Sequence, residues 1–173
     1  MKKGPRGFSL IELLIVVAII LIIAAIAIPN LLRSRIAANQ ASAVGSLRTL
    51  NTAEVTYSTT YNTGYSSQLA YLGPGTGATP TASFAGLIDE VLSGIGSAGG
   101  TAPTANTSSK SGYTFVYSPA TADSNGKIDY YSFTASPVSP GTTGTNYYYT
   151  DQSGVIRQNS TAVAGSSDSP LAG

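Results

Sequence analysis

Two hydrophobic patterns follow one another in the first part of the chain. Residues 8–28 form an apolar run that is interrupted by only two polar side chains, Ser9 and Glu12. As a helix rising ~1.5 Å per residue, this run is about 30 Å long, which matches the hydrocarbon core of a bilayer. After Pro29 the apolar positions recur at helical spacing. They are Ile36, Ala43, Leu47, Leu50, Tyr57 and Tyr61.

These patterns predict one long helix that ends near residue 61, with its first half in a membrane and its second half packed on a partner surface. The polar residues between the apolar positions are expected on the solvated face of this helix. They are Asn39, Gln40, Arg48, Asn51 and Glu54.

The rest of the chain is typical of a loop region followed by strands. Residues 62–112 are rich in Gly, Ser, Thr and Pro, with a short amphipathic helix expected over 83–93, capped by Ser83 and ended by Gly94. Four β-branched or aromatic runs then predict two hairpins, the first with its turn at Asn125-Gly126. These runs cover 113–117, 128–133, 146–150 and 155–157. The expected fold class is α+β, with the second half of the long helix on a small antiparallel sheet.

Composition removes several function classes. Charged residues make up 10% of the chain, with 9 Lys and Arg against 8 Asp and Glu, so a dense basic face for nucleic acid is not expected. The sequence contains neither Cys nor His, which excludes disulfides, Cys/His zinc sites and His-based acid–base catalysis. We therefore expect a protein that is not an enzyme and needs no cofactor.

Glu12 allows two interpretations, because a charged side chain in a membrane helix costs roughly 2.5–3.5 kcal/mol at mid-depth and less near the interface. In the first, Glu12 lies one turn from the helix start, reaches the headgroups and favours the positive end of the helix dipole. In the second, it pairs with a cation that another subunit supplies.

The N-terminal residues resemble the type IV pilin superfamily. The resemblance rests on three features: a short basic leader ending in Gly7, an aromatic residue at Phe8, and Glu12 four residues later in an apolar run. It implies that a prepilin peptidase cuts between Gly7 and Phe8 and methylates the new Phe8 amine. It also implies that Phe8 and Glu12 of neighbouring subunits pair when the helices assemble into a filament.

The resemblance sets the expected organisation of the chain. Residues 1–7 are the leader, 8–29 the transmembrane and assembly helix, and 30–173 a periplasmic or extracellular head. Within the head, 30–61 is helix, 62–112 the connecting region, and 113–173 the sheet and tail. Pro29 either marks the membrane exit or places a kink where helical order is lost in the filament.

The expected function is that of a pilus subunit, inserted in the inner membrane and then carried on a surface filament. Its implied partners are further copies of itself, the prepilin peptidase, an assembly platform, an ATPase and an outer-membrane channel. The alternatives are a pseudopilin of a type II secretion system, which shares the same N-terminus, and an anchored periplasmic binding module. The last leaves Glu12 and the Gly7–Phe8 junction unexplained.

One weak metal candidate remains. Asp123, Asn125 and Asp129 cluster at the predicted hairpin turn and carry oxygen ligands suited to calcium. The spacing does not match an EF-hand loop, so turn geometry is the simpler explanation of these residues.

Overall fold

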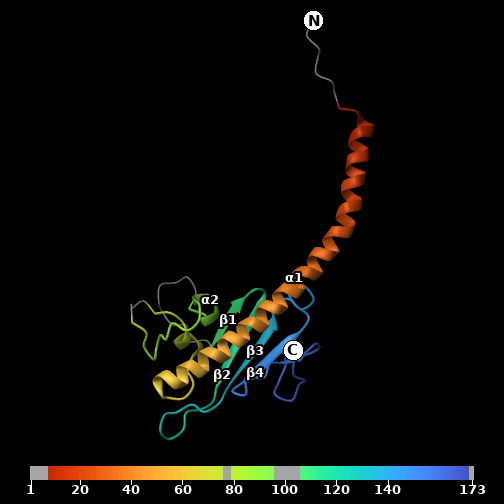
Figure 1. Ribbon diagram of the computed structural model, residues 1–173. Helices are drawn as coiled ribbons and strands as arrows, with labels where there is room; N and C mark the ends of the chain where they lie inside the picture. The colour runs from red at the N-terminus through yellow and green to blue at the C-terminus, as the bar shows by residue number, and fades with distance from the viewer. Residues whose placement is uncertain (1–7, 76–78, 96–105, 172–173) are drawn as a thin grey trace. The chain divides into compact units, whose positions relative to one another are not determined.

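The computed structural model describes residues 8–75, 79–95 and 106–171 (Figure 1). It divides the chain into two compact units, Met1–Arg35 and Ile36–Gly173, with the boundary inside a single helix, α1, at Leu10–Tyr61. We call the second unit the head. The head also contains the short helices η1 (Leu69–Leu72) and α2 (Glu90–Ser93).

The head has one antiparallel sheet with the strand order β1-β2-β3-β4-β5. Its strands are β1 (Thr107–Lys110), β2 (Tyr113–Pro119), β3 (Tyr131–Pro137), β4 (Tyr147–Asp151) and β5 (Arg157–Asn159). The C-terminal tail pairs with the outer edge of β5, where the Gln158 amide donates to the Ser169 carbonyl. That edge of the sheet is therefore partly covered by the chain itself.

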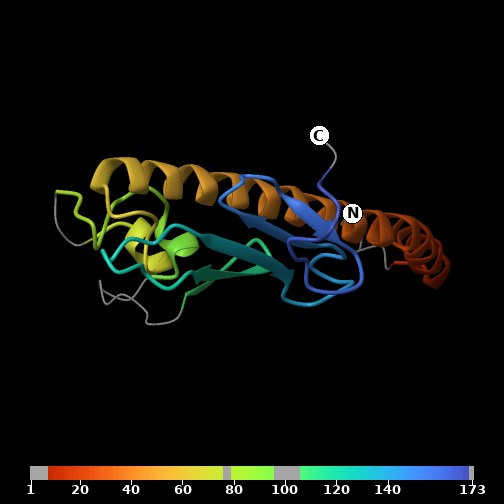
Figure 2. The ribbon, with the colours of Figure 1, turned by 90° about the horizontal axis from the view of Figure 1, so that it is seen from below.

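Within the head, the second half of α1 lies along one face of the sheet (Figure 2). Leu47 and Leu50 of the predicted apolar stripe are fully buried, and they pack with Phe115, Phe133 and other inward-facing strand residues. Inward side chains alternate with half-exposed ones along β3, as expected for a sheet with one covered face. The predicted α+β architecture, a long helix on an antiparallel sheet, is confirmed.

The strands differ from the prediction in three places. The run predicted over 155–157 forms strand only from Arg157 onward, because β5 pairs with β4 through Arg157 to Asn159. Strand β1 was not predicted, because its Thr-Ser-Ser-Lys sequence has no apolar alternation and forms by pairing with β2. Strand β3 begins at Tyr131 rather than at residue 128. Ile128 instead accepts a hydrogen bond from the Tyr65 amide, so it joins the segment that follows α1.

The helix predicted over 83–93 is wrong in its first half. The amides of Leu87 and Ile88 both donate to the carbonyl of Leu72, so they cannot donate to Ser83 and Phe84 as a helix would require. The helix reduces to α2, and its cap is Asp89, whose carboxylate accepts from the Leu92 amide at 3.0 Å. Gly94 ends α2 in the left-handed conformation, as predicted.

Candidate functional site

The first half of α1 exposes apolar side chains on every side. All the large apolar residues from Phe8 to Ile28 are exposed, including Leu14, which is 61% exposed. By length and composition α1 contains a stretch able to cross a membrane, and this stretch is not buried within the described residues. A helix that is apolar all round needs lipid or other helices around it rather than water.

Glu12 caps the helix to which it belongs. Its Oε2 accepts a hydrogen bond from the Ser9 amide at 2.9 Å, one residue before α1 begins. This is the backward half of a capping box, in which a carboxylate in the first turn satisfies an amide that has no helical partner. The carboxylate is thereby held beside the backbone of residues 8 and 9.

The predicted processing site is only partly within the described residues. Gly7 and the leader 1–7 lie outside them, whereas Phe8 is described and is 79% exposed. The backbone around Pro29 is helical, and α1 continues through it without interruption. A kink or loss of helical order at Pro29 in a filament stays a prediction.

Glu54 was expected on the solvated face of the helix, and the structure corrects this. Glu54 is fully buried, where its two carboxylate oxygens accept from the Ser66 amide at 2.9 Å and the Ser66 hydroxyl at 2.7 Å. The Tyr117 hydroxyl on β2 donates to the Ser66 carbonyl. These contacts tie α1, the segment after it and the sheet together in what we call the Glu54 cluster: Glu54, Ser66 and Tyr117.

Burial raises the pKa of Glu54 to about 7, and the hydrogen bonds from Ser66 offset part of this effect. The sequence did hold a signal for this residue. Glu54 lies four positions after Leu50 and three before Tyr57, so helical spacing places it on the apolar stripe itself.

The candidate calcium residues form a turn that its own hydrogen bonds explain. Asp123 Oδ1 accepts from the amides of Asn125 and Lys127, both at 2.8 Å, and Asp129 pairs with the Lys127 ammonium at 3.0 Å. The hydrogen bond from the Lys127 amide, and to a lesser extent that from the Asn125 amide, holds the pKa of Asp123 below its usual range. Among the described residues, no three Asp, Glu, His or Cys side chains are grouped so that they could hold a metal ion.

Comparison with known proteins adds to this picture. Residues 2–28 match the family described as the prokaryotic N-terminal methylation motif. The chain is 41% identical over 78 residues to the type IV wide pilus major component PilA4 of Thermus thermophilus, covering 45% of this chain and 60% of the relative. It is 52% identical over 52 residues to the type IV major pilin protein PilA of Myxococcus xanthus, covering 30% of this chain and 24% of the relative.

These matches confirm the resemblance of the N-terminus to the type IV pilins. The aligned part spans less than two thirds of either relative, so the similarity does not extend over the whole of those proteins. No solved structure matches the chain.

Proposed function

We propose that this chain is a structural, non-enzymatic subunit of a type IV pilus, polymerised through its N-terminal helix. The observation that carries the proposal is an apolar helical segment that is exposed on every side and coincides with the methylation motif. Lipid covers such a surface before assembly, and the same segment of neighbouring subunits covers it afterwards. The names of the two relatives, a wide pilus component and a major pilin, support this role.

In this proposal the prepilin peptidase cleaves after Gly7 and methylates Phe8. The amine of Phe8 stays cationic, since methylation of an amine keeps its charge. The Glu12 carboxylate of one subunit then pairs with the Phe8 amine of its neighbour. Glu12 already accepts from the amide of Ser9, the residue next to Phe8, so its carboxylate is held near the end that assembles. A buried pair of this kind sets the register between subunits more than it adds net stability.

The proposed route begins in the inner membrane and ends on a surface filament. The precursor spans the membrane once, with the basic leader on the cytoplasmic side. An assembly platform and ATPase extract the cleaved subunit, and an outer-membrane channel passes the growing filament. The head, with its covered core, travels outside the membrane throughout.

Mass spectrometry of the N-terminus tests this function. Material sheared from the surface of native cells is digested, and peptides from the start of this chain are identified. We expect an abundant peptide that begins at methylated Phe8 in the sheared fraction. A matched digest of the membrane fraction shows where the rest of the chain resides.

Two other results would point to a different function. Processed chain confined to the membrane fraction would identify a subunit that does not reach the surface, as in the pseudopilins of type II secretion. An N-terminus that still carries residues 1–7 in wild-type cells would contradict the cleavage and leave an anchored binding module.

A further inference from the structure

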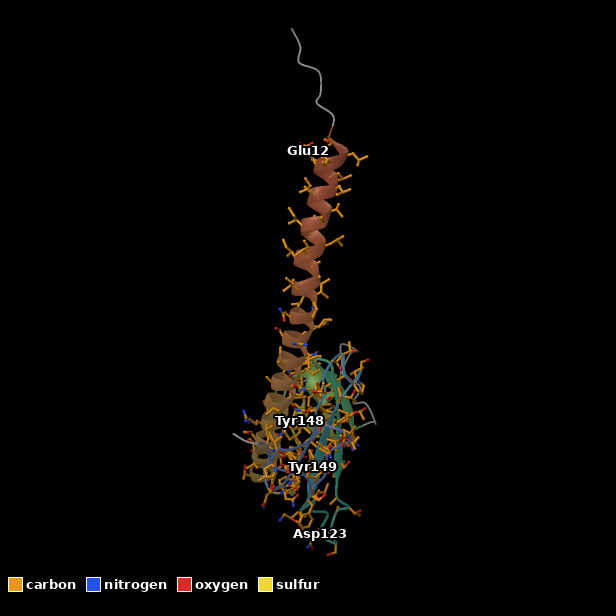
Figure 3. All side chains as sticks on the ribbon, turned by 90° about the vertical axis from the view of Figure 1, so that its right-hand side faces the viewer. Glu12, Asp123, Tyr148 and Tyr149 are labelled. Carbon is orange, nitrogen blue, oxygen red and sulfur yellow. The ribbon has the colours of Figure 1, made fainter. Side chains whose placement is uncertain are left out.

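The face of the sheet that turns away from α1 carries a distinct group of residues at one end. Thr150 on β4 faces the helix, where its hydroxyl accepts from the Asn51 amide group at 2.8 Å. Side chains alternate along a strand, so its neighbours Tyr149 and Asp151 face the opposite side. The neighbour of Tyr149 on its other side, Tyr148, is buried in the core, and both tyrosines are labelled in Figure 3.

Three strands bring polar side chains into one row on this outer face. Ser118 of β2 lies opposite Ser132 of β3, and Ser132 lies opposite Asp151 of β4. All three are at least partly exposed, as the alternation predicts. The row sits where β2 and β4 end and β3 begins, so the loops beyond the strands can wall it.

Two tyrosines border this row and, with it, line a shallow depression. Tyr149 lies beside Asp151 on β4, and Tyr130 comes from the loop just before β3. Together with Gln152 and the row of Ser118, Ser132 and Asp151, they line a depression of about 400 Å³. Tyr130 is 63% exposed, so its ring is accessible to a ligand.

The chemistry of the lining selects a class of ligand. Aromatic rings offer flat faces to C–H groups, while hydroxyl, amide and carboxylate groups hold ligand hydroxyls in place. The lining holds one carboxylate, Asp151, and none of its described residues is basic, so it offers an anionic ligand no cation to pair with. Arg157 of β5 lies opposite Tyr149, outside the lining, and its Nη1 donates to the Asp168 carbonyl. A pyranose sugar has both parts that this lining fits: a C–H face and a rim of hydroxyl groups.

We propose that this depression binds a neutral sugar, with Tyr130 and Tyr149 stacking on its C–H face and Asp151 and Gln152 holding its hydroxyl groups. We call it the sugar site. It lies entirely in the head, on the face opposite α1, so binding does not require polymerisation. In a filament that is assembled through α1, each subunit would present one such site, and many weak sites on one filament act together.

The test uses the full chain in a zwitterionic detergent, since a glycoside detergent would itself compete for the site. Cellotriose is the first probe, because the ring hydroxyls of its glucose units are equatorial and leave flat C–H faces. We expect a Kd of about 1 mM and saturation transfer from the protein to the C–H protons of the sugar rings. Chitotriose and sialyllactose serve as a second neutral probe and an anionic probe.

Variants locate the site. Tyr149→Ala and Tyr130→Ala are each expected to weaken cellotriose binding about tenfold, and Asp151→Asn to weaken it less, because the amide still accepts hydrogen bonds. Tyr130→Phe keeps the ring and is expected to keep most of the binding. The matched control is Tyr147→Ala, which removes a tyrosine from the same strand and face but outside the lining.

Three outcomes would overturn the proposal. The first is that neither neutral probe binds the wild-type chain at about 10 mM, ten times the expected Kd. The second is that sialyllactose binds more tightly than cellotriose. The third is that Tyr130→Ala and Tyr149→Ala reduce filament yield while no sugar binds, which would assign this face to a contact with a second copy. None of these results bears on whether the chain is cleaved after Gly7, so the pilus function and the sugar site can fail separately.

Discussion

The two halves of α1 belong to one helix but differ in how their apolar side chains are covered. In residues 10–28 all the large apolar side chains are exposed, and the described residues offer nothing to cover them. In residues 36–61 most large apolar side chains lie on one stripe, and Leu47 and Leu50 on it are completely buried against the sheet.

This difference separates what each half depends on. The head half is stabilised within a single chain, because its partner is the sheet that follows it in sequence. The apolar half must find its partners elsewhere, and in the proposed function these are first lipid and then other subunits. A substitution in one half is therefore expected to change the folding of the head, and a substitution in the other to change assembly.

The largest expected effect concerns Glu12, in the apolar half of α1. We expect Glu12→Ala to insert in the membrane normally and to give no filaments, because the Phe8 amine of the neighbouring subunit would be buried without its partner, at roughly 3–5 kcal/mol. Filaments are counted by electron microscopy of sheared material, and insertion is checked by membrane fractionation. The head is expected to melt at an unchanged temperature.

A second variant separates the two roles of this side chain. Glu12→Gln still accepts the hydrogen bond from the Ser9 amide but carries no charge. Loss of filaments in this variant too would assign the defect to the missing charge, and Glu90→Ala, which removes an exposed carboxylate of α2, is the matched control. Normal filaments from Glu12→Ala would refute the pairing with Phe8.

Two leucines of α1 test the comparison directly. Leu47→Ala empties a fully buried position and is expected to reduce the free energy of unfolding of the head by about 2–5 kcal/mol. Leu14→Ala, at a position that is 61% exposed, is expected to change it by less than about 0.5 kcal/mol. Denaturant unfolding of the full chain in detergent, followed by tyrosine circular dichroism, measures both. Equal losses would mean that the two halves do not differ as described.

The elements that the sequence predicts well are those whose own residues decide their structure. The apolar run, the stripe of α1, strand β2 and the turn at Asn125-Gly126 all carry a strong local pattern, and the structure contains each of them. The methylation motif is likewise a local pattern, and the comparison with known families finds it over residues 2–28.

The features that the sequence does not reveal depend on distant partners. Strand β1 exists because β2 offers it hydrogen bonds, and the amides of Leu87 and Ile88 donate to the carbonyl of Leu72 instead of to a helix. The sugar site joins residues from three strands and two loops, so no short segment contains its pattern. Glu54 is a different case, since its helical spacing already predicts burial and only its polarity predicts exposure.

The Glu54 cluster makes the stability of the head depend on pH. Because the pKa of Glu54 is raised from 4.5 to about 7 on folding, the folded head binds this proton more tightly than the unfolded chain. The extra stability is fully present below pH 4.5 and is lost as the pH rises to about 7, with a loss of about 3 kcal/mol. The chain has no His or Cys, so few other groups titrate in this interval.

Thermal melting at a series of pH values measures this effect. We expect the head to melt at a lower temperature at pH 8 than at pH 5, with most of the change between those values. Glu54→Gln keeps an acceptor for the Ser66 amide but cannot ionise, so its profile is expected to be flat. Glu90→Gln is the control at an exposed carboxylate, and an unchanged profile in Glu54→Gln would assign the titration to another group.

The smallest expected effect is on the stability of the head, when either of two glycines with open space around them is replaced by alanine. A Cβ added at Gly45 in α1 or at Gly126 in the β2–β3 turn meets nothing within 4 Å, but only Gly126 has a positive φ, at +78°. Gly45→Ala is therefore expected to stabilise the head by up to about 1 kcal/mol, because alanine favours the helix and restricts the unfolded chain. Gly126→Ala is expected to destabilise it by a similar amount, because a side chain is strained in the left-handed region. Melting temperatures that move by about 3 °C in opposite directions would confirm both.

A loss of filaments in Gly45→Ala, together with a raised melting temperature, would place the exposed side of the head half of α1 against a neighbouring subunit. In that case the head half would also need partners outside its own chain, and the contrast between the two halves would hold for folding but not for assembly.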